Sequence, residues 1–246
     1  MRGQLEKWVR SKRCYLYLLV VTAMALFWAR RSGSKVGMPV AMILAMYPVY
    51  LFDLSQGRRD LAVSHTLFWV FFSSVLMIYF VRQDAARMSR LVFNGAAYRD
   101  EMFQWILTGQ GAEGSIRLFL PQHLKHFALL CVSSLLTGGL WGLALGAVLV
   151  NYMNFYVGSL LFHARRPLLV LLLGWPIWSL FRVAGFVFCG VALSEPLLSQ
   201  LFRFRPDFRR SFPYFLWGLV FILIDILLKA TLASFWRDLL RRAVSF

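Results

Sequence analysis

Asp225 and Lys229 are the residues whose types and spacing are best suited to chemistry in this chain. They lie four positions apart inside a long apolar stretch, and on an α-helix this spacing places both side chains on one face, where they can pair. A charged side chain at the centre of a membrane helix costs about 2.5–3.5 kcal/mol. The two charges therefore line a path for a substrate, ion or proton, or they form a structural ion pair with a third buried residue such as Arg182, which also lies in an apolar run.

Asn151 and Asn154, with Tyr152 and Tyr156, place amide and phenol groups at the end of a glycine-rich stretch. They either cap a break in a helix or line a polar site, as the unwound segments of some transporters do. Both interpretations stay open from the sequence alone.

His123 and His126 are three positions apart and could contact one metal ion. Two histidines without a neighbouring carboxylate or cysteine fall short of a metal site, so we expect both to lie at the membrane interface. The three cysteines are far apart and form no C-x-x-C pair, and the chain contains no H-E-x-x-H, P-loop or G-x-S-x-G motif. We therefore expect a protein that is not an enzyme and has no metal or cofactor.

The elements that must position these residues follow from composition. The chain of 246 residues is 59% hydrophobic and 15% charged, too apolar for a soluble protein to cover its surface with polar groups. Its apolar residues are grouped into runs long enough to cross a bilayer. We predict an all-α integral membrane protein, a polytopic bundle of about six transmembrane helices that forms one membrane domain over residues 1–246. The predicted spans cover residues 14–29, 36–52, 66–81, 127–150, 167–193 and 213–236.

Residues 82–125 form a different kind of segment, because charged residues alternate there with large apolar ones. This mixture indicates one or two interfacial amphipathic helices, interrupted between Gly109 and Gly114. We expect this segment to lie on the bilayer surface.

Residues 127–162 carry no charge and are too many for one straight crossing of a hydrocarbon core about 30 Å thick. A turn is needed, either at Gly138 and Gly139 or at Asn151 to Asn154. We expect a helix over residues 127–150 and a short return to residue 162, and whether the segment crosses once or twice stays open.

Gly138, Gly142 and Gly146 repeat at the spacing of a small-x-x-x-small motif. Small residues at this spacing leave one helix face without large side chains, so that the backbone of another helix can approach closely, either within the chain or from another subunit.

The net charge of +16 suggests either nucleic acid or anionic lipid as a partner. The basic residues lie mainly between the apolar runs, in pairs such as Arg30-Arg31, Arg58-Arg59 and Arg165-Arg166. This placement favours anionic lipid headgroups, and we expect no nucleic acid partner.

Residues 127–236 resemble the membrane domain of the stage II sporulation protein M family. The likeness rests on Gly138, Gly142, Gly146, Asn154, Gly158, Pro176 and Gly190. The chain departs from the family pattern at Asn154-Phe155-Tyr156, which lacks the adjacent glycine, and at Ile177, Trp178 and Phe181, where the family has His, Gly and Glu. The resemblance implies a membrane component of a larger complex.

The broader outline, with basic helices between short spans, is similar to permease subunits of bacterial ABC transporters. We therefore expect a non-enzymatic integral membrane subunit that acts by helix packing with other membrane protein subunits in a complex. The alternative is a small transporter or a permease-like subunit of the ABC type. The expected location is the bacterial cytoplasmic (inner) membrane, as a multi-pass protein.

Overall fold

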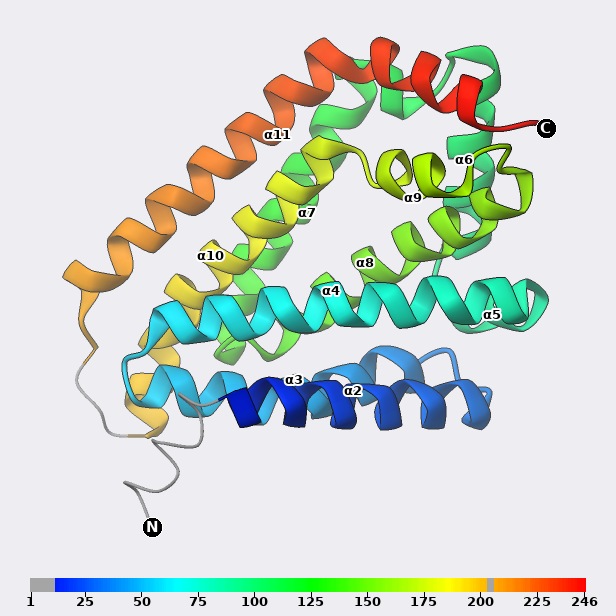
Figure 1. Cartoon of the computed structure of the whole chain (residues 1–246). Coiled ribbons are helices and arrows are strands. Elements are labelled where there is room, and N and C mark those ends of the chain that lie inside the picture. The colour runs from blue at the N-terminus through cyan, green and yellow to red at the C-terminus, as the bar shows by residue number, and fades with distance from the viewer. Residues whose placement is uncertain (1–11, 203–205) are drawn as a thin grey trace.

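The computed structural model describes residues 12–202 and 206–246, and this part of the chain is helical apart from its connections (Figure 1). The prediction of an all-α fold is confirmed. The long helices are α2 (Lys12–Ser32), α3 (Gly37–Ser55), α4 (Arg59–Gln83), α7 (Ile116–Thr137), α8 (Leu140–Leu160), α10 (Ile177–Leu201) and α11 (Phe208–Ala243). The shorter ones are α5 (Ala85–Leu91), α6 (Gly95–Thr108), η1 (Ala112–Gly114), η2 (Leu161–His163) and α9 (Pro167–Gly174).

Six helices among the described residues are long and apolar enough to cross a membrane, namely α2, α3, α4, α8, α10 and α11. The chain is therefore an integral, multi-pass membrane protein. The predicted run 167–193 is divided into α9 and α10 by Trp175 and Pro176, because proline lacks the N–H that would continue the helix.

The helices form two groups in Figure 1. Helices α2, α3 and α4 lie side by side as an antiparallel layer, while α7, α10 and α11 run obliquely to that layer. Helix α8 contacts both groups and is the most buried of the six spans, with 61% of its most apolar window covered. Helix α11 lies at the periphery and has only 22% of its window covered.

The prediction of one helix over residues 127–150 is wrong, because the chain reverses earlier. Helix α7 ends at Thr137, and Gly138 and Gly139 follow with φ angles of 59° and 87°. Such left-handed angles are easily adopted only by glycine. The two glycines therefore make the turn between α7 and α8.

Helices α10 and α11 approach each other closely at another pair of glycines, Gly185 and Gly218. A Cβ atom on Gly185 would lie 2.9 Å from the carbonyl oxygen of Gly218, and one on Gly218 would lie 3.0 Å from that of Gly185. The backbones of two helices meet here because neither residue carries a side chain.

The segment 82–125 is only partly a surface element. Helix α6 is amphipathic as predicted, since it buries Met102 and Trp105 and exposes Asp100, and it ends before Gly109, where the interruption was expected. However, Glu113 is buried within the bundle. Lys229, which is also buried, provides its partner, and the position of the segment relative to the bilayer surface stays a prediction.

Candidate functional site

A cavity of about 80 Å³ lies inside the bundle between α4, α7, α8 and α10. Apolar side chains such as Leu130, Leu143 and Phe186 form most of its wall. The lining residues run from Ser179 to Gly190 along α10, which at about 1.5 Å per residue is a length of roughly 16 Å. The lining of the cavity therefore follows about three turns of α10.

The glycines of the predicted packing motif have three different roles around this cavity. Gly138 belongs to the turn, so the expectation that all three share one helix face is wrong. Gly142 lets α7 approach α8, because a Cβ atom there would lie 2.0 Å from Ser134 Oγ. Gly146 lines the cavity, and a Cβ atom there would meet nothing within 4 Å.

Two polar groups in the wall have no hydrogen-bond partner among the described residues. They are Trp69 Nε1 and Ser134 Oγ, and their residues are only 2% and 1% exposed. A buried polar group without a partner costs about 1–3 kcal/mol. In native proteins such groups are usually satisfied by water or a ligand.

Arg182 supplies a third polar group to the wall. Its Nε and Nη2 atoms donate to Asp225 Oδ2 and Oδ1, each at 2.9 Å. Its Nη1 atom donates to no described residue, and the side chain is 21% exposed. The structure thus joins Arg182 of α10 to Asp225 of α11, and Arg182 is also one of the residues that line the cavity.

Lys229 has a different partner from the one expected. Its Nζ atom donates to Glu113 Oε2 at 2.7 Å and lies 4.6 Å from the centre of the Phe119 ring, while Trp178 Nε1 donates to Glu113 Oε1 at 3.0 Å. No hydrogen bond or ion pair joins Asp225 to Lys229 within residues 12–202 and 206–246. The predicted direct pair is therefore wrong, because α10 and η1 each supply a closer counter-charge.

The pKa of Glu113 reflects this setting. Burial raises it, but the neighbouring Lys229 and Arg182 lower it more, so that the net pKa lies below its usual value of 4.5. Glu113 is therefore a carboxylate at neutral pH. Two cations and two carboxylates form a charge network beside the cavity, comprising Arg182, Lys229, Glu113 and Asp225.

The two histidines lie near this network. His123 Nε2 is 3.7 Å from Asp225 Oδ2, and its side chain is only 10% exposed, so it lies among the buried charges, while its depth in the membrane stays a prediction. His126 lines the cavity. Groups of three or more metal-binding side chains do not occur among the described residues.

Asn151 and Asn154 do not mark a helix break. Both lie inside the continuous helix α8 and are buried. Asn154 Nδ2 donates to Ser74 Oγ at 3.2 Å, and Asn151 Nδ2 faces Met42 Sδ at 3.1 Å. They therefore hold α8 against its neighbours. Of the two predicted positions for the turn, the chain uses Gly138 and Gly139 and not Asn151 to Asn154.

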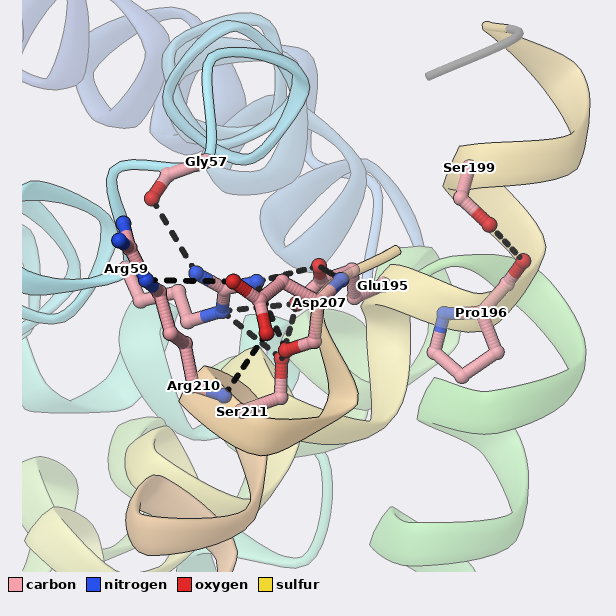
Figure 2. Close-up of polar contacts among 8 residues, drawn as sticks. All are labelled: Gly57, Arg59, Glu195, Pro196, Ser199, Asp207, Arg210 and Ser211. Carbon is pink, nitrogen blue, oxygen red and sulfur yellow. Dashed lines mark hydrogen bonds and ion pairs between the residues drawn. The ribbon is translucent and has the colours of Figure 1, made fainter. Parts of the chain in front are cut away.

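A second buried ionic cluster joins the first turns of α4 and α11 to α10 (Figure 2). Arg59 forms an ion pair with Glu195, and Ser211 Oγ donates to the same carboxylate. The Asp207 backbone N–H donates to Glu195 Oε1 at 3.0 Å. Arg59 is only 4% exposed, so its expected role in binding lipid headgroups is wrong.

A third buried polar contact joins α3 and α4. His65 Nδ1 lies 2.7 Å from Asp53 Oδ2, and both side chains are fully buried. The sequence interpretation included neither this contact nor the Arg59–Glu195 pair. Asp53 and Glu195 are acidic residues within or beside apolar runs, and that signal could have identified them.

Comparison of the chain with models of protein families, with curated proteins and with solved structures finds no match.

Proposed function

We propose that this membrane protein works by binding a small molecule between its helices, as a transporter or permease does. The observation that carries the proposal is the cavity, whose lining includes Arg182 and two buried residues, Trp69 and Ser134, with side-chain polar atoms that have no hydrogen-bond partner among the described residues. Ligand sites of proteins combine mostly apolar walls with a few well-placed polar groups. The charge network beside the cavity supports the proposal, since ionisable residues inside membranes commonly accompany substrate paths.

The proposed role is non-enzymatic, in the bacterial cytoplasmic membrane. The acids nearest the cavity are already engaged, Asp225 by Arg182 and Glu113 by Lys229. Asp225 orients Arg182, and Glu113 compensates the charge of Lys229. A catalytic acid or base must instead exchange a proton with a substrate.

Mass spectrometry of small molecules that copurify with the protein tests this function. The test compares the wild type with Gly146→Leu, which fills the cavity, and with Ala230→Leu, which adds the same side chain at an exposed position of α11. We expect a molecule that is retained by the wild type and Ala230→Leu and lost from Gly146→Leu. Equal recovery from all three proteins would contradict the proposal.

A second candidate function is that of a subunit in a membrane complex. It is favoured by α11, whose outer face exposes Leu216, Leu223 and Leu227 and lies at the edge of the bundle. Purification in a mild detergent distinguishes the two functions. A protein partner at a fixed stoichiometry supports the subunit, and a solitary chain that retains a small molecule supports the binding function.

A further inference from the structure

The shape of the cavity limits the kind of molecule that fits. Its volume is about 80 Å³, and its lining residues extend along about three turns of α10, from Ser179 to Gly190. Apolar residues such as Leu130, Leu143 and Phe186 line this length. A single extended hydrocarbon chain matches this form better than a compact polar solute.

The polar groups of the wall are donors. An indole N–H and a guanidinium can only donate, and a serine hydroxyl can also donate. Arg182 lies near one end of the cavity with Ser179 and His126, whereas Ser134 lies near the other end, beside Gly142. A ligand therefore needs oxygen atoms that accept hydrogen bonds, with at least one at the Arg182 end.

The charges beside the cavity already balance. Arg182 is paired with Asp225, and Lys229 is paired with Glu113. Burial lowers the pKa of His126, and the nearby Arg182 lowers it further, so the imidazole adds no positive charge at neutral pH. An anionic ligand would bring an uncompensated charge into a low-dielectric interior, where an unpaired ion is strongly disfavoured.

We propose that the cavity binds a neutral amphiphile, a molecule with one apolar chain and an uncharged head that accepts hydrogen bonds. The head lies at the Arg182 end of the cavity, and the chain extends between α7, α8 and α10 toward Ser134. This inference rests on the proposed function and adds the chemical class of the ligand.

Photolabelling in phosphatidylcholine vesicles tests the inference. The probe is methyl hexadecanoate that carries a diazirine in its chain, and the competitors are unlabelled methyl hexadecanoate, hexadecanoate and hexadecane. These competitors share a chain length and differ in having a neutral acceptor head, a charged head or no head. We expect label on cavity residues and competition by the ester at concentrations about tenfold lower than the other two, a difference of about 1.4 kcal/mol.

Three variants show whether the labelled site is the cavity. Gly146→Leu should abolish labelling and Ala230→Leu should preserve it. Trp69→Phe keeps the aromatic ring but removes the N–H donor, so it should weaken labelling. Thermal unfolding verifies that each variant is folded. Gly190→Val is the second filling variant, since a Cβ atom there would meet only Ser134 Oγ, at 3.7 Å.

The outcomes separate the two proposals. Stronger competition by hexadecanoate, or equal competition by hexadecane, overturns the neutral acceptor head and leaves a cavity that binds some other ligand. Labelling that is unchanged in folded Gly146→Leu and Gly190→Val shows that the probe binds elsewhere and overturns the neutral amphiphile. The proposed function is overturned separately, by equal recovery of copurified molecules from the wild type, Gly146→Leu and Ala230→Leu.

Discussion

Arg182 of α10 and Asp225 of α11 form a two-point ion pair, in which two guanidinium nitrogens each donate to one carboxylate oxygen at 2.9 Å. The contact links the last two long helices, α10 and α11. The third guanidinium nitrogen, Nη1, donates to no described residue. Asp225 thus holds Arg182 in the cavity wall.

The first prediction concerns this pair. Asp225→Ala leaves a cation in the interior and should reduce the free energy of unfolding by about 3–5 kcal/mol. The double variant Arg182→Met, Asp225→Leu should recover much of that loss, because it removes both charges. Unfolding in detergent measures each stability. A parallel cycle of Asp225 with Lys229 should show weaker coupling, and coupling as strong as that with Arg182 would contradict the pairing seen here.

The second prediction compares two helix glycines. Gly185→Ala should destabilise the protein by about 1–3 kcal/mol, because its Cβ would meet the Gly218 carbonyl oxygen at 2.9 Å. Gly146→Ala should stabilise it by about 0.5–1 kcal/mol, since alanine favours a helix and the new methyl group meets nothing. Thermal unfolding of the two proteins side by side is the measurement. Equal effects would show that α10 and α11 do not approach each other at these glycines.

The third prediction concerns pH. Because the folded-state pKa of Glu113 lies below 4.5, its contribution to stability is present above the unfolded-state value and disappears as the pH falls through the folded-state value. Wild-type protein should lose more stability than Glu113→Gln as the pH falls below about 4.5. Unfolding of both proteins across this range provides the comparison. Parallel curves would mean that the Lys229–Glu113 contact does not stabilise the fold.

The fourth prediction concerns the second ionic cluster. Glu195→Gln leaves Arg59 without its buried counter-charge and should cost about 3–5 kcal/mol. Arg210→Gln is the matched control, since this ion pair with Asp207 lies on the surface and should contribute less than about 1 kcal/mol. Denaturant unfolding measures both stabilities, by the shift of the midpoint at an unchanged dependence on denaturant concentration. Similar losses for the two variants would show that the buried Arg59–Glu195 pair stabilises the protein no more than the surface pair.

The sequence alone predicts the fold class, because membrane helices appear as long apolar runs that depend little on distant residues. Pro176 explains why the predicted span over residues 167–193 is divided into α9 and α10, because proline cannot continue a helix. The choice between Gly138-Gly139 and Asn151 to Asn154 needs more than local pattern. Both are able to break a helix, and the burial of Asn154 against Ser74 of α4 keeps α8 continuous.

Charge pairing is the less predictable part of the site. The spacing of Asp225 and Lys229 suggests a contact along one helix, but their partners come from Arg182, 43 positions away from Asp225, and from Glu113, 116 positions away from Lys229. Arg59 follows a helix end like a headgroup-binding residue, and only the packing of α10 and α11 reveals Glu195 beside it. The cavity likewise depends on residues from five helices, α3, α4, α7, α8 and α10, and has no sequence pattern of its own.

The central claim is that the cavity between α4, α7, α8 and α10 binds a ligand. An experimental density map of the protein extracted from its own membrane, with a bound antibody fragment for size, tests it most directly. We predict an elongated density that is continuous along the cavity, with one end within hydrogen-bonding distance of the Arg182 guanidinium. A cavity that contains only separate water molecules, or that is closed by the side chains around Gly146, would contradict it.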